Sequence, residues 1–379
     1  MIYLDNSATT MLDEAVLEEM LPWMRQEYGN ASSIYALGRR ARVVVEKART
    51  EVAGLINAHP AELTFTSGGT ESNNSVLMSA CRESGLVDRV VVGSIEHHAV
   101  LAPSEELASQ GYRHHVLGVD AEGRYRPEDV ASFNDARTLI SLMHANNETG
   151  TIQPLAQLRA AVPDALLHTD AVQTLGKIRF DVQQLGVDFA SFSAHKIHGP
   201  KGVGAMFIRK GIDFKAHQVG GGQERNRRAG TEPVALIVGF AAALRRSVSE
   251  LDQRGTQMQA QIDTARAMIL ELIPDVRVNT PRDGSLPNIL NVSFRDADRL
   301  DGESILQLMD MRGIAVSNGS ACVSGSLQPS HVLSAMGLSD AEARAAVRIS
   351  VSQHTTNEEI ATAVQTLASI LRELRESTR

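Results

Sequence analysis

The sequence predicts an α/β protein with a mostly parallel central sheet, helices on both faces of that sheet, and a smaller α/β unit. Two observations predict this class. Short apolar or β-branched runs alternate with longer segments of helical period, which is typical of parallel strands joined by crossover helices. The runs are apolar along most of their length, as expected for strands that are covered on both faces.

The expected strands of the larger unit are six such runs. They are ELTFTS, RVVVGS, TLISLMH, ALLHTDA, DFASFSA and VGAMFIRK, at residues 62–67, 89–94, 138–144, 165–171, 188–194 and 203–210. Helical period is clearest in residues 36–56 and 155–162. Because ligands gather beyond the carboxyl ends of parallel strands, the polar residues that follow these runs are expected to share one pocket.

A long polar helical stretch, residues 233–273, leads to a second unit. There, LPNILNVSF, ILQLMDMRGIAVS and AVRISVS are interpreted as a strand, a helix and further strands. We place the domain boundary inside the helical stretch. Residues 14–255 form the predicted large domain, and residues 1–13 with 256–379 form the predicted small domain.

Composition excludes several classes of protein. The net charge of −8 argues against a nucleic-acid surface, although the cluster Arg225, Arg227 and Arg228 is compatible with a small anion such as phosphate. The start MIYLDNSATT lacks the features of a signal peptide, and no apolar run approaches the length of a membrane span. The 2 cysteines, Cys81 and Cys322, are too few for a disulfide framework, so we expect a cytoplasmic protein.

The stretch TSGGTESNN follows the first expected strand. Gly69 precedes an expected helix that Thr70 opens, and the exposed backbone N–H groups of a helix N-terminus favour a phosphate group. The alternative is an ordinary capped helix after a tight turn. A three-glycine dinucleotide motif is absent, which argues against a nicotinamide cofactor.

Asp170 lies at the end of one expected strand, and Lys196 follows the next expected strand, one crossover unit further along the chain. A buried carboxylate needs a partner, and for Asp170 that partner is either a protonated pyridine nitrogen or a helix that begins at Ala171. Burial favours the neutral amine of Lys196, which can form a Schiff base; the alternative is a structural lysine paired with a carboxylate. A phosphate site, an acid for a ring nitrogen and an amine for an aldehyde together indicate pyridoxal 5′-phosphate.

His97 and Cys322 extend this hypothesis. The 12 histidines show no zinc-type spacing, so no metal is expected, and His97 can instead lie on a flat ring and move protons. Cys322 lies in VSNGSACVSGSLQPSH, whose small residues predict a loop that presents a nucleophilic thiol; an unselected surface cysteine is the alternative. Cys81 has the helical apolar surroundings of a core residue.

These motifs resemble those of the cysteine desulfurases, a branch of the class V aminotransferases with the type I fold of pyridoxal-phosphate enzymes. The resemblance runs from YLDNSATT through FTSGGTESNN, EHHAV, HANNETG, DAVQ, SFSAHKIHGPKGVG, GGGQERNRRAGT and PNILNVSF to SNGSACVSG and VRISVS. It therefore covers nearly the whole chain.

The resemblance implies a role for each matching residue. Lys196 holds the cofactor and later moves protons, Asp170 pairs with the pyridine nitrogen, and His97 stacks on the ring. Gln173 matches the residue that binds the phenolic oxygen. The residues implied at the phosphate are Gly69, Thr70, Ser193 and His195, with Thr231 reaching it from the partner subunit of a homodimer. Asn147 and Arg348 are the implied ligands of the substrate carboxylate.

The implied reaction removes sulfur from L-cysteine, which leaves alanine and a persulfide on Cys322. The sulfur then passes to a protein acceptor, such as an iron–sulfur scaffold or a sulfur carrier. Two alternatives stay open: a selenocysteine lyase or other class V relative that needs no catalytic thiol, and a scaffold protein without activity.

Overall fold

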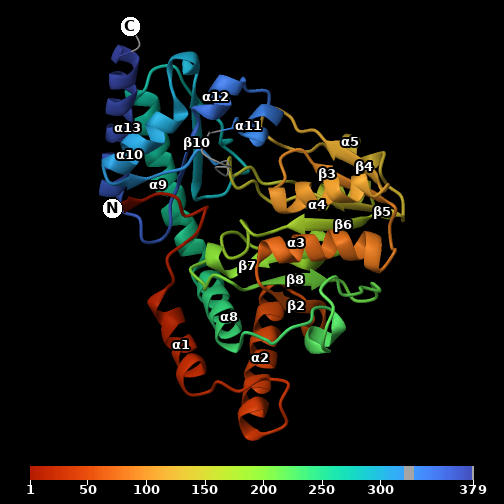
Figure 1. Cartoon of the computed structure of the whole chain (residues 1–379). Helices are drawn as coiled ribbons and strands as arrows, with labels where there is room; N and C mark the ends of the chain where they lie inside the picture. Colours follow the sequence, from red (N-terminus) through yellow and green to blue (C-terminus); the bar gives the residue numbers. More distant parts are fainter. Residues whose placement is uncertain (320–327, 378–379) are drawn as a thin grey trace.

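The structure is a computed structural model that describes residues 1–319 and 328–377 (Figure 1). Cys322, the expected nucleophile, lies outside the described residues. The larger part of the molecule is built around a central sheet. The first residues of the chain lie with its C-terminal elements in a smaller part.

The central sheet contains the six predicted runs. Its strands are β2 (Leu63–Thr66), β3 (Arg89–Gly93), β4 (Arg113–Leu117), β5 (Thr138–Ser141), β6 (Leu166–Asp170), β7 (Phe189–Ser193) and β8 (Gly204–Ile208), in the order β2-β8-β7-β6-β5-β3-β4. Strand β8 runs antiparallel to β2 and β7, whereas the pairs from β7 to β4 are parallel. The predicted mostly parallel sheet is confirmed, and all strands except β8 end at the same edge.

Strand β4 was not predicted. It pairs with β3 at the edge of the sheet, and its Arg113, His115 and Val116 side chains are exposed. A strand that buries so little of its surface does not need the apolar pattern by which the other strands were found.

Helices cover both faces of the sheet, as the apolar runs predicted. Val91 packs into a cluster with α2 (Ala36–Leu55), α6 (Leu155–Ala161) and α8 (Val234–Ser249). Val90 and Val92 point to the opposite face, toward α3 (Gly69–Met78) and α4 (His98–Ser109), because successive side chains of a strand alternate. The remaining helices of this part are α1 (Glu14–Arg25), α5 (Pro127–Ala131) and α7 (Val182–Leu185).

The predicted helical stretch 233–273 is two helices. Helix α8 ends at Ser249 and α9 (Leu251–Leu272) follows, because Glu250 leaves the helical region with φ −109° and ψ 13°. Helix α8 is buried in the core under the sheet, whereas α9 buries Met258 and Ile262 in a separate cluster. The break is therefore the point at which the chain passes from one hydrophobic core to the other.

The second core belongs to the smaller part. An antiparallel sheet of order β12-β10-β9 lies against α9 and three further helices, and β1 pairs in parallel with β11. The bounds are β1 (Ile2–Tyr3), β9 (Val276–Val278), β10 (Ile289–Phe294), β11 (Ile314–Ala315), β12 (Val347–Ser350), α10 (Gly302–Met311), α11 (His331–Ala335), α12 (Asp340–Arg344) and α13 (Asn357–Ser377). Val332 and Met336 of the α11 region pack into the first core instead. The division at residues 255 and 256 stays a prediction.

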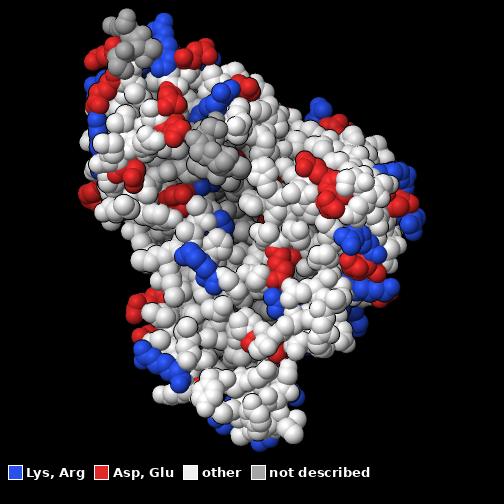
Figure 2. Space-filling view, viewed as in Figure 1, with Lys and Arg blue, Asp and Glu red and all other residues white. Residues whose placement is uncertain are grey.

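On the face shown in Figure 2, lysine and arginine lie among aspartate and glutamate, mostly toward the rim, and much of the surface between them is uncharged. Neither sign forms a continuous patch on that face. Across the described part of the chain, no helix combines the length and the apolar character that a bilayer span requires.

A buried ion pair holds the loop before α8 against the sheet. Arg49 of α2, 1% exposed, donates to both carboxylate oxygens of Glu224, at 2.6 and 2.8 Å. Glu224 also accepts the backbone N–H of Phe65 in β2, at 2.8 Å. The loop that contains Thr231 is thus fixed by one carboxylate that bonds to a helix and to a strand.

Replacing Arg49 by methionine is expected to lower the free energy of unfolding by about 3 kcal/mol, because Glu224 is left buried without its counter-ion. Urea denaturation measures this change. The matched control is Arg40→Met, which breaks an exposed pair with Glu27 and is expected to cost less than about 1 kcal/mol. If both variants lose the same free energy of unfolding, the buried pair does not stabilise the fold more than the exposed pair.

Candidate active site

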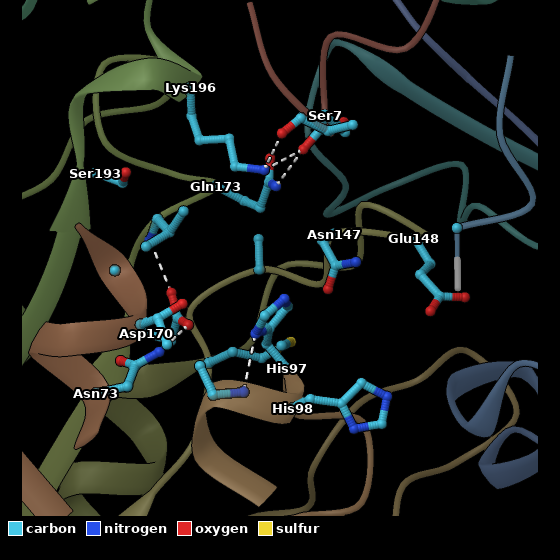
Figure 3. A pocket seen from close by; sticks show the side chains of 18 of the residues that line it. Ser7, Asn73, His97, His98, Asn147, Glu148, Asp170, Gln173, Ser193 and Lys196 are labelled. Carbon is cyan, nitrogen blue, oxygen red and sulfur yellow. Dashed lines mark hydrogen bonds between the residues drawn. The ribbon is translucent and has the colours of Figure 1, made fainter. Parts of the chain in front are cut away.

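A cavity of about 390 Å³ opens at the edge where the parallel strands end (Figure 3). Residues from both parts of the molecule line it. Of the predicted site residues, it is lined by Gly69, Thr70, His97, Asn147, Asp170, Gln173, Ser193, His195, Lys196 and Arg348. The sequence prediction that polar residues after different strands share one pocket is therefore confirmed.

Lys196 follows β7 in a short turn, Ala194–Lys196, and its side chain reaches across the cavity. The Nζ atom donates to the backbone carbonyls of Ser7 and Ala8, at 2.5 and 2.7 Å. Burial and, to a smaller extent, Arg348 lower the pKa of Lys196 to about 8, against the opposing charges of Asp170 and Asp5. Among the described residues the amine makes no ion pair, so the alternative of a structural lysine paired with a carboxylate has no support there.

Asp170, the last residue of β6, is 8% exposed. One carboxylate oxygen accepts Nδ2 of Asn73 at 2.6 Å, and the other accepts the backbone N–H of Val172 at 2.9 Å. Residues 172–177 form turns, so the alternative of a helix beginning at Ala171 is wrong. One oxygen of Asp170 therefore stabilises the turn that follows β6, and Asn73 of α3 donates to the other oxygen.

The N-terminus of α3 approaches the cavity closely. The helix begins at Gly69, one residue before the predicted Thr70. A Cβ atom on Gly204 of β8 would lie 2.7 Å from the Cα of Gly68, so β8 needs glycine there to let the turn before α3 lie against it. Ser193 and His195 lie beside this N-terminus in an adjoining hollow, which also contains Thr70.

Two histidines of the site are held in their neutral form. His97 caps α4, where its Nδ1 accepts the backbone N–H of Ala99 at 3.0 Å, so the neutral ring carries its proton on Nε2. Burial lowers the pKa of His97, although Asp170 opposes this. Burial also lowers the pKa of His195 to about 4, and its Nδ1 lies 3.1 Å from the Thr9 hydroxyl.

Gln173 and Arg348 lie on the side of the cavity nearest the smaller part. Gln173 donates from Nε2 to the carbonyl of Ser7 at 3.0 Å. Arg348 of β12 donates to Asp5 at 2.5 Å and to the carbonyl of Asn147 at 2.8 Å. Its Nε atom is buried and has no hydrogen-bond partner in the part of the chain described. Because Arg348 lines the cavity, its guanidinium is suited to a carboxylate ligand there.

Other predicted residues lie elsewhere. Thr231 is exposed in the loop before α8 and does not line this cavity. The three arginines predicted to bind an anion have partners within the chain instead. Arg225 pairs with Glu46, Arg228 pairs with Glu71, and Arg227 donates to the carbonyl of Ala61. Cys81 is 2% exposed, and burial raises the pKa of its thiol to about 12, as expected of a core cysteine.

Sequence reasoning missed several residues of the site. Asn73 holds Asp170, and Ser7 offers its carbonyl to both Lys196 and Gln173. Glu148 is fully buried at the cavity wall, where burial raises its pKa to about 7 and it accepts the Ser330 hydroxyl at 2.5 Å. Asn73 and Glu148 were visible only as parts of the quoted motifs GGTESNN and NNETG.

The described residues fit pyridoxal 5′-phosphate. The cavity brings together an amine whose pKa is lowered by burial, a buried carboxylate and a glycine at a helix N-terminus. These are the groups that its aldehyde, ring nitrogen and phosphate require.

Comparisons with known proteins agree with this geometry. The family model "Aminotransferase class-V" matches residues 2–362. The cysteine desulfurase NifS of Azotobacter vinelandii is 40% identical over 99% of this chain and 93% of its own length. The cysteine desulfurase IscS of Dictyoglomus turgidum is 43% identical over 99% of this chain and 95% of its own length.

Solved structures show the same relationship. A NifS-like protein superposes with a TM-score of 0.90 at 39% identity and covers 98% of this chain and 99% of its own. SspA in complex with cysteine superposes with a TM-score of 0.80 at 32% identity, over 94% of this chain and 100% of its own. The resemblance seen in the motifs is confirmed: the chain belongs to the class V aminotransferase family and, within it, to the cysteine desulfurases.

Proposed function

We propose that this protein is a cysteine desulfurase that binds pyridoxal 5′-phosphate and transfers the sulfur of L-cysteine to Cys322. The observation that carries the proposal is the partly neutral amine of Lys196 in one cavity with Asp170 and the N-terminus of α3. Full-length similarity to cysteine desulfurases supports the choice of reaction.

The cofactor would be held by residues from several elements. Lys196 would bind its aldehyde, Asp170 its ring nitrogen, and Gln173 its phenolic oxygen, while His97 would lie against the ring. The phosphate ligands would be Gly69, Thr70, Ser193 and His195. When bound, pyridoxal 5′-phosphate supplies an electron-withdrawing ring that stabilises negative charge on the α-carbon of an amino acid.

The residues of the chain then have separate tasks. Arg348 and Asn147 would bind the carboxylate of cysteine, since both line the cavity and a guanidinium suits a carboxylate. Lys196, whose pKa is about 8, can take and return a proton at the α-carbon near neutral pH. The Cys322 thiolate would attack the substrate sulfur, so that a sulfur–sulfur bond forms as the carbon–sulfur bond breaks. Alanine leaves after its β-carbon is protonated.

We further propose that the protein acts as a homodimer in the cytoplasm. Thr231 is exposed outside the cavity of its own chain, as a residue that serves a partner's site must be. Large apolar side chains are exposed along α1, α2 and the segment between them, which favours an interface there: Met24, Tyr28, Ile34, Tyr35 and Val43. A reducing compartment keeps the Cys322 thiol free to react, and its persulfide then needs a protein acceptor, for which we propose an iron–sulfur scaffold or a sulfur carrier.

The reaction of the apo protein with pyridoxal 5′-phosphate is expected to accelerate as the pH rises through about 8, because only the neutral amine of Lys196 attacks an aldehyde. Absorbance and borohydride trapping measure the rate of capture. Arg348→Gln removes a positive charge that lowers the pKa of Lys196, so its midpoint should move to higher pH. A wild-type midpoint near 10.5, the ordinary value for lysine, contradicts the proposed role of burial.

Cys322→Ala is expected to bind the cofactor normally and to lose alanine and sulfide formation from cysteine. Cys81→Ala is the matched control and should retain activity, since that thiol is buried in the core. Product analysis by mass spectrometry, with detection of persulfide on Cys322 in the wild type, measures both outcomes. Sulfide release that survives in Cys322→Ala favours a relative without a catalytic thiol.

Asp170→Asn is expected to retain covalent cofactor but to lower kcat by about a hundredfold or more, because a charge that stabilises the activated state is removed. Steady-state alanine formation measures kcat. The control Asp164→Asn changes an exposed carboxylate just before the other end of the same strand and should behave as wild type. Asp170 has no electrostatic role if the two variants have equal kcat.

A further inference from the structure

Lys177 is a buried lysine whose position the proposed reaction does not explain. It lies in the turn region after β6 and is 8% exposed. Its Nζ atom donates to Oε1 of Gln173 at 2.9 Å. Gln173 in turn donates from Nε2 to the Ser7 carbonyl at 3.0 Å, so its amide is held at both ends.

The surroundings of Lys177 do not stabilise its charge. Within residues 1–319 and 328–377 it makes no ion pair with a carboxylate. Lys196 and Arg348 add positive charge nearby, and His198 and Arg254 line a cavity of about 20 Å³ together with Lys177. Burial, assisted by the positive charges of Lys196 and Arg348, lowers the pKa of Lys177 to about 7. A lysine placed in this way costs stability, so its presence needs another reason.

The reason lies in the two ends of the Gln173 amide. The ammonium form of Lys177, which predominates below about pH 7, only donates hydrogen bonds, so it selects the oxygen end of the amide. The N–H end is therefore directed to the other side, toward Ser7 and the cavity. Without Lys177, the amide can rotate by half a turn and present its oxygen there instead, where it would repel an oxygen anion.

We propose that Lys177 is a positioning residue that fixes Gln173 with its N–H group toward the phenolic oxygen of the cofactor. This inference rests on the proposed function, because it assigns the phenolic oxygen to Gln173. Lys177 itself does not touch the cofactor. It acts through the amide, and it polarises the N–H group that donates.

The test compares wild type, Lys177→Met, Gln173→Ala and the double variant, all as full-length protein. The control is Lys210→Met, since Lys210 is exposed beyond the opposite end of β8. Three quantities are measured: the affinity of the apo protein for pyridoxal 5′-phosphate, the pH midpoint of the absorption change of the bound cofactor, and the urea midpoint of unfolding.

Lys177→Met is expected to weaken cofactor binding about tenfold and to raise the spectral midpoint by about one pH unit, each the equivalent of one hydrogen bond. Its urea midpoint should equal or exceed that of wild type, because an uncompensated buried charge is removed. Lys210→Met should match wild type in all three. In the Gln173→Ala background, Lys177→Met should have no further effect on the spectrum or the affinity.

Several results would overturn the inference. A spectral shift of equal size with and without Gln173 means that Lys177 acts by its charge and not through the amide. A lower urea midpoint with an unchanged spectrum means that its role is structural. If Lys177→Met does not fold, Lys177→Gln supplies the same comparisons. If wild type itself captures no cofactor, the proposed function fails and not this inference alone.

Discussion

The site depends on keeping an amine partly uncharged beside two carboxylates. Burial and Arg348 lower the pKa of Lys196, whereas Asp170 and Asp5 raise it, and the balance lies near neutral pH. Burial is the largest contribution, so the amine depends on the depth of the cavity more than on any single neighbour. Arg348 thereby gains a second role, because the cation proposed to bind the substrate carboxylate also favours the reactive form of Lys196.

The cavity gets its depth from a contact between the two parts of the molecule. Strand β1 pairs with β11, and the chain then passes along the cavity, where the carbonyls of Ser7 and Ala8 hold Lys196. Asp5 holds Arg348 of β12 from the same segment. A backbone segment that bonds to the sheet edge on one side and to the smaller part on the other fixes the relative positions of the amine and the guanidinium.

The sequence was sufficient to predict which residues lie together at the ends of parallel strands. Asp170 and Lys196 follow apolar runs, and parallel strands must bring such ends to one edge. It did not predict the pairs that join distant segments: Asn73 reaches Asp170 through the packing of α3 on β6, and no local pattern encodes that contact. Strand β4 and the break at Glu250 were also missed, since an exposed strand and a helix that changes cores both weaken the periodicity from which elements are predicted.

Some buried polar and charged groups of the described chain lie in or beside the site. Arg348 has a buried Nε without a partner, Lys177 is buried without a carboxylate, and Glu148 is buried with a pKa raised to about 7. Each of these costs stability in the protein alone. A fold that only had to be stable would favour apolar residues at such positions, so these groups in and beside the cavity support a role in binding a ligand with several charged groups. The energy of binding such a ligand then comes partly from charges that the fold leaves uncompensated.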